Sequence, residues 1–460
     1  MEHMTAGDIA KACGGHLLAG DPQTPVEHIS LNSNEMKGND LFVPLIGERV
    51  DAHRFIAQAM ENGAAAALTS EHSRAPEGAV GVWIQVEDTK AALQALGTFC
   101  RSRLPLPVIG VTGSVGKTTT REMIAAALSA GRRVFKTPGN YNSQVGVPVT
   151  VSEISSSDEI AVVELGMSEP GEMTVIARIA CPDMAVITNI GVAHIGQLGS
   201  RENIYREKMA VLDGLREGGI LVLNGDDPWL KESRAKDGCR TVYYGLGEHC
   251  EYRAEQVRIS EGYPSFTAVC RGVRVPVTLR VMGLHQVGNA LAALAAADLN
   301  GVSLTAAAKA LESYVGYQGR QQQFESGGIL FIDDTYNASP ASMTAAMDLL
   351  SSLDRGGRRI AVLADMKELG EEEVRFHREV GTHVGKSRID LLLTYGNLAE
   401  ELAKAALEER PGLAALHFRE RQALEKYLTD HLESGDAVLL KGSNSMKLGE
   451  VAQHVCRYYH

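Results

Sequence analysis

A glycine-rich segment between an apolar strand and an amphipathic helix constrains the fold of this chain more than any other feature. The segment PVIGVTGSVGKTTTREMIAAAL starts at Pro107 with a strand-forming run, and it continues after Gly116 as a helix-compatible stretch. Glycines at such a junction let backbone N–H groups converge on phosphate oxygens, and the N-terminus of the following helix attracts anions. We therefore predict a nucleoside-triphosphate site within an α/β fold.

Individual residues of this loop have predicted roles in nucleotide binding. Lys117 supplies a point charge to the β- and γ-phosphates, and Thr118 offers a hydroxyl to magnesium. The other expected nucleotide contacts are neighbours in the loop: Gly113, Ser114, Val115, Gly116 and Thr119. The loop is a variant of the strict pattern, because Val111 stands where that pattern has glycine. A glycine-rich turn without a ligand is the alternative, and the flanking strand and helix favour phosphate binding.

The length and the order of the expected elements predict three α/β domains. A chain of 460 residues is too long for one core. The proline-containing segment RSRLPLP marks a boundary near Leu104, so the first domain is expected at 1–104. From 105–317, apolar runs alternate with helical patterns, which is typical of a mostly parallel sheet. A second, smaller open α/β unit is expected at 318–460.

Charge, hydropathy and cysteine usage exclude several classes of protein. The net charge of −12 and the absence of basic runs with interleaved aromatics argue against a nucleic-acid partner. The chain has no apolar stretch long enough to span a membrane and no secretory signal. Its seven cysteines are scattered without a C-x-x-C pair, which argues against disulfides and zinc. We expect a cytoplasmic protein with reduced thiols.

Several polar residues follow expected strands, where the ligands of open α/β sheets bind. Glu164 ends the run AVVELG and His194 follows AVITNIG, so both could reach a metal beside the loop. Carboxylate suits magnesium better than imidazole does, and helix capping or core packing is the alternative for His194. In the third unit, the strand ends carry Asp333, Asp334, Asp365, Tyr395 and Lys441.

Two basic residues are ambiguous from their local sequence. Lys208, in ENIYREKMAVLDGL, is by itself most simply a solvated helix lysine. Arg320, in GYQGRQQQF, is either a surface charge at the domain boundary or a phosphate clamp brought in when the domains close.

Six segments together resemble the Mur ligase family in order and spacing: TGSVGKTTT, GNYNSQVGVPVT, ELGMSEPGE, NIGVAHIG, GLHQVGNALAALAA and DDTYNASPASM. The resemblance covers almost the whole chain. DDTYNASP and LADMKELGEEEVRFH are most similar to the members that add D-alanyl-D-alanine to UDP-N-acetylmuramoyl-tripeptide. The resemblance implies an ATP-dependent amide ligase with an acyl-phosphate intermediate. It also implies three domains: a UDP-sugar domain, a central ATPase domain and a Rossmann-like C-terminal domain. We expect a monomer.

The resemblance also implies roles for individual residues. Thr118, Glu164 and His194 match the family's magnesium ligands, and Lys208 matches a carbamylated lysine that holds a second magnesium ion. Arg320 matches an arginine on the γ-phosphate and, with Lys117, Lys208 and His194, belongs to the implied catalytic set. The implied nucleotide contacts are Asn289, Asp334, Tyr336 and Asn337. The implied substrate contacts are Ser33, Asn34, Asn140, Asn142 and Lys441. For the asparagines, a turn or cap is the alternative.

Two departures from the family's pattern leave a related function open. Asn34 and Asn444 stand where arginines are common, which removes a positive charge near the expected nucleotide-sugar and peptide sites. A paralogous amide ligase with another carboxylate or amine is therefore one alternative. A nucleotide-dependent switch without ligation is a more remote one, because a switch does not need Glu164, His194 and Lys208 beside the loop.

Overall fold

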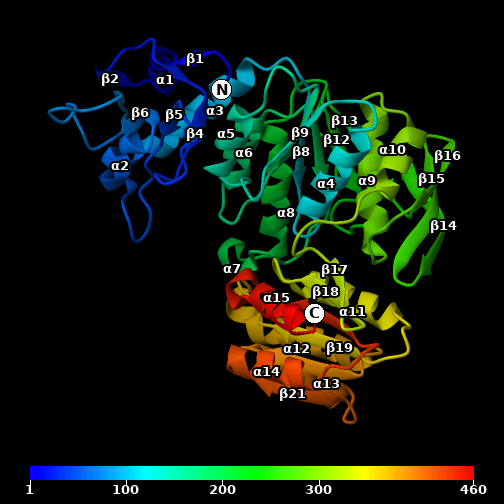
Figure 1. Ribbon diagram of the computed structural model, residues 1–460. Helices are drawn as coiled ribbons and strands as arrows, with labels where there is room; N and C mark the ends of the chain where they lie inside the picture. The colour runs from blue at the N-terminus through cyan, green and yellow to red at the C-terminus, as the bar shows by residue number, and fades with distance from the viewer. Residues whose placement is uncertain (460) are drawn as a thin grey trace.

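The structure, a computed structural model, describes residues 1–459. Three α/β units are visible in Figure 1: the N-terminal one in blue, a central one from cyan to green, and a C-terminal one from yellow to red. Their sheets use strands between 16–85, 108–278 and 322–441. The limits predicted at residues 104 and 317 fall between these sheets.

The N-terminal unit contains a five-stranded sheet in the order β2-β7-β6-β5-β4. The strand β2 is antiparallel to β7, and the remaining pairs are parallel. The strands are β2 (His16–Ala19), β4 (His28–Ser30), β5 (Asp40–Phe42), β6 (Ala64–Thr69) and β7 (Val82–Gln85), with a separate ribbon of β1 (Met4–Thr5) and β3 (Pro25–Val26). The helices are α1 (Ala6–Cys13), α2 (Ile56–Glu61) and α3 (Thr89–Ser102).

The helix α3 joins the N-terminal unit to the central one. It packs against α5 (Gly146–Ser152) and α6 (Glu172–Ala180). At this contact a Cβ on Gly97 would lie 2.7 Å from the Cα of Pro148, so only glycine lets the helices approach this closely. The first core cluster accordingly runs from Ile9 and Leu93 into the central sheet, and the two units share one hydrophobic core.

The central sheet has nine strands in the order β16-β15-β14-β13-β12-β11-β8-β10-β9. The strands are β8 (Val108–Thr112), β9 (Val134–Lys136), β10 (Ile160–Glu164), β11 (Met184–Ile187), β12 (Ile220–Asn224), β13 (Arg240–Gly245), β14 (Tyr252–Ser260), β15 (Tyr263–Cys270) and β16 (Val273–Thr278). Strands β8 to β14 pair in parallel, as the alternation of strands and helices predicts.

Both faces of the parallel part are covered, so its strands are apolar on both sides. Along β8, Val108 joins the core with α5 and α6, whereas Ile109 joins the core with α4 (Lys117–Leu128) and α9 (His285–Leu299). The other helices are α7 (Ile195–Leu198), α8 (Arg201–Met209) and α10 (Leu304–Glu312).

The far edge of this sheet departs from the strand-helix alternation expected for 105–317. Strands β14, β15 and β16 form antiparallel pairs without intervening helices. The buried and exposed residues of β16 alternate in part, which is typical of a sheet with one face towards water. In Figure 1 these strands lie at the edge of the central unit beside α9 and α10, on the side opposite the N-terminal unit.

The C-terminal unit has a six-stranded sheet in the order β17-β18-β22-β19-β20-β21, in which only the edge strand β17 is antiparallel. The strands are β17 (Gln322–Ser326), β18 (Ile329–Asp334), β19 (Arg359–Ala364), β20 (Leu391–Tyr395), β21 (Ala414–Phe418) and β22 (Ala437–Lys441). The helices are α11 (Pro340–Ser352), α12 (Glu373–Lys386), α13 (Ala399–Glu409), α14 (Arg421–His431) and α15 (Leu448–Tyr458). Separate apolar clusters cover its two faces, so this open α/β sheet has its own core.

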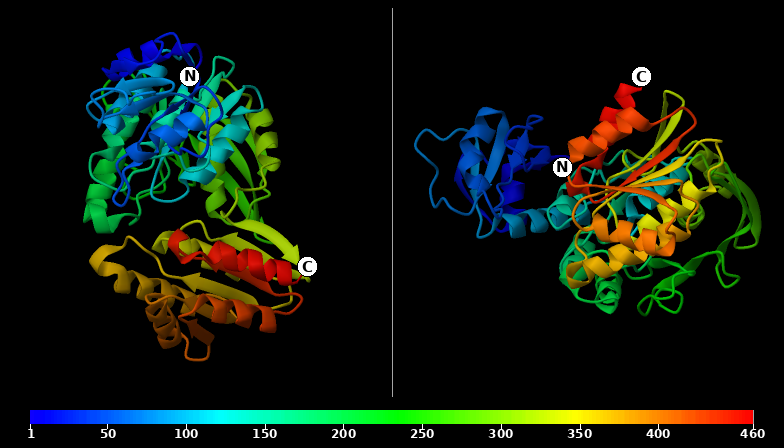
Figure 2. Two further views of the ribbon diagram at one scale, coloured as in Figure 1. Left: turned by 60° about the vertical axis from the view of Figure 1, so that its left-hand side comes forward. Right: turned by 90° about the horizontal axis from the view of Figure 1, so that it is seen from below.

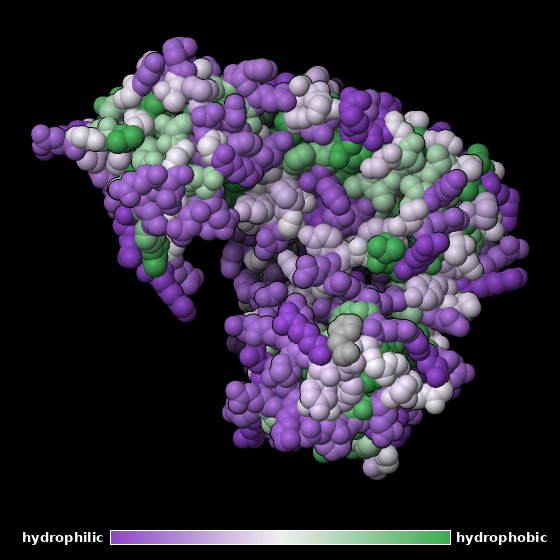
Figure 3. Space-filling model, viewed as in Figure 1, coloured by the Kyte–Doolittle hydropathy of each residue, from purple (hydrophilic) through white to green (hydrophobic). Residues whose placement is uncertain are grey.

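The C-terminal unit lies against the central unit, whereas the N-terminal unit projects to the side (Figures 1 and 2). The space-filling view shows a hollow between the N-terminal and C-terminal units, bordered mainly by hydrophilic residues (Figure 3). Among residues 1–459, no helix has the length and apolar character needed to cross a membrane.

Candidate active site

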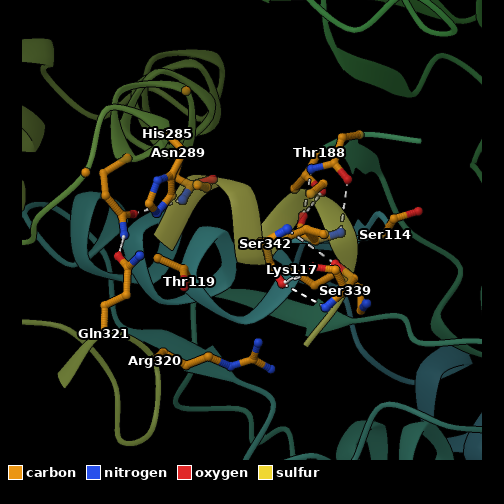
Figure 4. Close-up of a pocket in the computed structure, with 18 of the residues that line it drawn as sticks. Ser114, Lys117, Thr119, Thr188, His285, Asn289, Arg320, Gln321, Ser339 and Ser342 are labelled. Carbon is orange, nitrogen blue, oxygen red and sulfur yellow. Dashed lines mark hydrogen bonds between the residues drawn. The ribbon is translucent and has the colours of Figure 1, made fainter. Parts of the chain in front are cut away.

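A cavity of about 790 Å³ lies between the central and C-terminal units. Its wall combines the phosphate loop with the first turns of α9 and α11 (Figure 4). The segment after β19 also lines it. The predicted residues that line it are Ser114, Val115, Gly116, Lys117, Thr118, Thr119, His194, Asn289, Arg320, Asp334, Asn337 and Lys441. Segments far apart in the sequence therefore meet at one site.

The shape of the phosphate loop depends on close backbone packing. Gly113 has φ +145°, and a Cβ there would lie 1.9 Å from Thr188 Oγ1, so no other residue fits without a rearrangement. Asn189 holds the loop from the next strand end: its carbonyl accepts a bond from Ser114 N–H, and its Oδ1 accepts one from Val115 N–H. The loop is preorganised by these contacts.

Three helices place their N-terminal residues at the cavity. The helix α4 contributes Lys117 to Thr119, α9 contributes His285 to Asn289, and α11 contributes Ser342 after the N-cap Ser339. A helix N-terminus carries unpaired N–H groups and a partial positive charge. The cavity is therefore suited to a multiply charged anion.

Lys117 adds a full positive charge to this environment. Its Nζ donates a hydrogen bond to the carbonyl of Gly113, 2.9 Å away, which keeps the side chain folded over the loop. Burial lowers the pKa of Lys117, and the nearby Glu164 carboxylate opposes that shift. An anionic phosphate would favour the charged ammonium in the same way.

Glu164 lies beneath the loop in a network of donors. Its Oε1 accepts bonds from Thr118 Oγ1 at 3.3 Å and from Asn142 Nδ2 at 2.7 Å, and its Oε2 accepts one from Arg121 Nη1 at 3.1 Å. Thr118, Arg121 and Glu164 are all buried. The end of β10 and the first turn of α4 thus bring a hydroxyl and a carboxylate together, as the sequence predicted.

His194 enters the cavity from the start of α7. Its backbone is in the left-handed region, at φ +63°. Its Nδ1 lies 2.7 Å from Oε2 of Glu368, a residue of the C-terminal unit. The two atoms are close but not aligned as a regular hydrogen bond, because Nδ1 has no well-aligned partner within residues 1–459. The contact with His194 lowers the pKa of Glu368, and this carboxylate is therefore charged.

Arg320 spans the boundary between the two units. Its Nη2 lies 3.4 Å from Thr118 Oγ1, and its guanidinium lies over the ring of Tyr336, 4.0 Å from the centroid. Tyr336 does not line the cavity, and it packs against the guanidinium of Arg320. Of the two interpretations left open by the sequence, the geometry favours the phosphate clamp over a surface charge.

Lys208 is not the solvated helix lysine that its local sequence suggests. It is 1% exposed and forms no ion pair among residues 1–459. Burial, and then the charge of Lys117, lower its pKa well below the ordinary value for lysine. Lys208 does not line the cavity. The neighbouring Glu207 points elsewhere, because it accepts bonds from Gly171 N–H and Met173 N–H at the start of α6.

The remaining predicted nucleotide contacts form two groups. Asn289 accepts a bond from Thr120 Oγ1 at 3.0 Å and donates one to Gln286 at 2.9 Å, which fixes its side chain beside the loop. On the opposite side, Lys441 Nζ is 2.6 Å from Asp334 Oδ2 and 3.0 Å from the carbonyl of Asn337. Because the buried Lys441 and Asp334 compensate each other, neither is a free charge for a ligand.

Of the residues predicted to contact the sugar-peptide, only Lys441 lines this cavity. Ser33 and Asn34 belong to the N-terminal unit, where their side chains bond to Gln58 at 3.4 and 2.8 Å. Asn140 is exposed near the central sheet, and only Asn142 reaches the cluster around Glu164. The structure therefore does not bring Ser33, Asn34 and Asn140 to the phosphate loop.

Sequence reasoning did not select several residues at the site. Arg121, Asn189, His285, Gln321 and Glu368 all contact predicted residues or line the cavity. Arg121 could have been found, because it follows Thr118 by three positions on the same helix face. The others are brought to the site by tertiary contacts, which no local pattern indicates.

Comparisons with known proteins match each part of the chain to one family. The Mur ligase middle domain matches residues 111–297, and the Mur ligase glutamate ligase domain matches 319–444. The Mur ligase family catalytic domain matches 25–99.

Curated relatives and solved structures agree with these matches. The chain is 40% identical to the UDP-N-acetylmuramoyl-tripeptide--D-alanyl-D-alanine ligase of Bacillus subtilis over 94% of this chain and 93% of the relative. It is 31% identical to the Escherichia coli protein of the same name, with 98% of each covered. The structure resembles MurF from Acinetobacter baumannii with a TM-score of 0.90, at 31% identity and 99% coverage of both chains. It also resembles MurF from Thermotoga maritima in complex with ADP with a TM-score of 0.82, at 29% identity, covering 95% of this chain and 98% of that one.

Proposed function

The chain belongs to the Mur ligase family, and from this premise we propose that it joins D-alanyl-D-alanine to UDP-N-acetylmuramoyl-tripeptide with the consumption of ATP. The relatives named for this reaction match over more than nine-tenths of the chain. A ligase of this type makes an amide bond for peptidoglycan precursor synthesis.

The observation that carries the proposal is the meeting of Lys117 and Arg320 at one cavity. Lys117 comes from the phosphate loop, and Arg320 reaches Thr118 from the start of the C-terminal unit. A binding protein needs only the loop. A second cation from another unit is suited to charge that develops during phosphoryl transfer. The ADP complex of the Thermotoga maritima neighbour supports ATP as the nucleotide.

In the proposed reaction, a carboxylate oxygen of the tripeptide attacks the γ-phosphorus of ATP. The bond from that phosphorus to the β–γ bridging oxygen breaks, and ADP leaves. Lys117 and Arg320 stabilise the negative charge that spreads over the transferring group. The amine of D-alanyl-D-alanine then attacks the acyl phosphate, and the tetrahedral intermediate collapses to amide and phosphate, with loss of a proton from nitrogen. Closure of the two units over the bound substrates would limit the entry of water, which would otherwise hydrolyse the acyl phosphate.

Thr118 and Glu164 would hold magnesium at this site. Their side-chain oxygens are 3.3 Å apart and buried, and hydroxyl and carboxylate oxygens are hard ligands of the type that Mg²⁺ prefers. His194 would be a third, less usual ligand. When bound, the ion neutralises phosphate charge and orients the phosphates. The residues fit the group, because Glu164 Oε1, which now accepts from Thr118 and Asn142, could turn to a cation.

Lys208 is suited to carbamylation, which would create a ligand for a second magnesium ion. The reaction of a lysine with CO₂ requires the neutral amine, forms an N–C bond and releases a proton. Burial favours the neutral amine at Lys208, and Lys117 favours it further. The carbamate would convert an uncompensated buried amine into an anion near these cations.

We place the nucleotide-sugar on the N-terminal unit near Ser33 and Asn34, so that the peptide crosses the hollow towards Asn140 and Asn142. We further propose a monomer, in which one chain carries both the phosphate loop and Arg320. The seven cysteines are free thiols, which suits the reducing cytoplasm where ATP and nucleotide-sugars are available.

The test is phosphate release by the purified protein with ATP, Mg²⁺ and UDP-N-acetylmuramoyl-tripeptide, with and without D-alanyl-D-alanine. We expect release that depends on the dipeptide, with the pentapeptide product identified by mass. A folded, nucleotide-binding protein that is silent with this pair but active with another carboxylate or amine would contradict the proposed substrates.

A further inference from the structure

We propose that Glu368 is a positioning residue for His194, and that the backbone contact between Gly196 and Gly370 brings it into place. The inference rests on the proposed function and adds to it a way in which the C-terminal unit completes the site. Neither Glu368 nor the two glycines belong to the set predicted from the sequence.

A side-chain contact between Glu368 and His194 crosses the boundary between the C-terminal and central units. Glu368 Oε2 lies 2.7 Å from His194 Nδ1, and both residues line the cavity with Lys117 and Thr118. A carboxylate beside one ring nitrogen of histidine favours a proton on that nitrogen and restricts rotation of the ring, which leaves the other nitrogen for a ligand. With Nδ1 facing Glu368, Nε2 is the nitrogen left to meet a ligand.

A backbone contact next to these side chains brings Glu368 close to His194. Gly196 N–H donates to the carbonyl of Glu368 at 3.2 Å. A Cβ on Gly196 would lie 2.9 Å from Gly370 N, and a Cβ on Gly370 would lie 2.8 Å from Gly196 Cα. Gly370 also has φ +63°. Glycine at both positions is therefore required for this approach of the two units.

Hydrogen bonds within the C-terminal unit hold the segment that carries Glu368. The preceding segment is held by Met366 N–H, which donates to His377 Nε2 at 2.9 Å, and by Lys367 N–H, which donates to Ser443 Oγ at 2.9 Å. Glu368 itself is in the left-handed region at φ +66°, which is strained for a residue with a Cβ. A segment held in this way moves with its sheet.

The His194–Glu368 pair depends on the relative placement of the central and C-terminal units. His194 belongs to the central unit and Glu368 to the C-terminal one, so the pair exists only while the units are in contact. The approach of the C-terminal unit thus orients His194 at the same time as it brings Arg320 to Thr118. Separation of the units would release both.

The test compares Glu368→Gln and Glu368→Asp with a matched control, Glu371→Gln. Glu371 directly follows Gly370 in the same segment, and its side chain is exposed, so the loss of its charge should leave activity unchanged. An outer-shell partner of a metal-bound histidine typically contributes about 10- to 100-fold to metal affinity or activity. We expect Glu368→Gln to lower kcat by about that factor with little change in the KM for ATP, and Glu368→Asp to recover part of the loss.

A binding measurement separates positioning from a merely structural role. Mn²⁺ binding in the presence of ADP, followed by electron paramagnetic resonance, should weaken by about 10-fold or more in Glu368→Gln and stay unchanged in Glu371→Gln. Gly196→Ala should show the same loss together with a larger radius of gyration in solution. Its melting temperature should stay close to that of the wild type, because the added methyl group clashes only with the other unit.

The outcomes distinguish this inference from the proposed function. Wild-type kcat and Mn²⁺ affinity in Glu368→Gln would overturn the positioning role. Unchanged dimensions and activity in Gly196→Ala would overturn the role of the glycine contact. If the wild type made no pentapeptide but Glu368→Gln still bound Mn²⁺ more weakly, the proposed substrates would be wrong and the positioning role would stand.

Discussion

Arg320 Nη2 lies 3.4 Å from Thr118 Oγ1, although 202 residues separate them in the chain. The contact joins the start of the C-terminal unit to the first turn of α4. Because Arg320 reaches the site only across this boundary, its charge is available when the two units are together. We therefore expect Arg320 to act on the reaction more than on nucleotide capture.

Replacement of Arg320 tests this expectation. Arg320→Ala should lower kcat by about 10²- to 10³-fold, the usual effect of removing one donor to developing charge, with a smaller change in the KM for ATP. Arg320→Lys keeps a charge but loses the planar contact with Tyr336, so it should recover only part of the rate. Steady-state kinetics measure both. A rise in KM at unchanged kcat would identify a ground-state contact instead.

Lys117 should be needed for turnover but not for folding. Lys117→Ala removes the ammonium that bonds to Gly113 O, and we expect kcat to fall by about 10²- to 10³-fold or more. The matched control is Lys309→Ala, at an exposed position of α10. Both proteins should melt near the wild-type temperature. Near-normal ligation by Lys117→Ala would contradict the assignment of the phosphate loop.

Lys208 should be required as a carbamate. We expect Lys208→Ala to be nearly inactive and to regain part of its activity when a small carboxylic acid is added, because the acid can supply the missing anion. Lys231→Ala, at an exposed position, is the control. Mass spectrometry of the intact wild type under CO₂ should show the mass of one added CO₂. Full activity of Lys208→Ala without any additive would refute the carbamate.

Arg121 should matter for stability, because it neutralises two buried carboxylates. Its guanidinium is fully buried and contacts both Glu164 and Glu122. Arg121→Met leaves those charges without this partner, and breaking such a buried pair typically costs about 3–5 kcal/mol. Urea unfolding measures the change. Arg121→Lys, which keeps the charge, should lose less, and equal losses in the two variants would point to packing alone.

His377 should make stability depend on pH. Its Nε2 accepts the Met366 N–H, which requires a neutral ring, and burial lowers its pKa. The stabilisation is fully present above the pKa of the unfolded residue, about 6.5, and it is lost as the pH falls from there through the lower pKa of the folded state. Melting temperatures from about pH 7.5 to 5 should fall more steeply for the wild type than for His377→Gln, whose side chain does not titrate. Parallel curves would contradict this assignment.

Local patterns determined the parts of the fold that depend on short-range physics. The strand, loop and helix around Gly113 and Gly116 were predictable because glycine permits the backbone conformation that a phosphate loop requires. The apolar runs of β10, β11 and β18 likewise predicted parallel, buried strands. Glu164 and Thr118 could be paired in advance, because the carboxyl ends of neighbouring parallel strands share one edge.

Only the tertiary structure decided how distant segments meet. No periodicity shows that Lys208 is buried or that Lys441 is compensated by Asp334, because burial and charge pairing depend on which elements pack together. The same is true of Arg320 on Thr118 and of Glu368 on His194, whose contacts cross between two units. The sequence by itself therefore determined the elements and the phosphate loop. The relative placement of the units decided which charges share the site, because that placement arises from long-range packing.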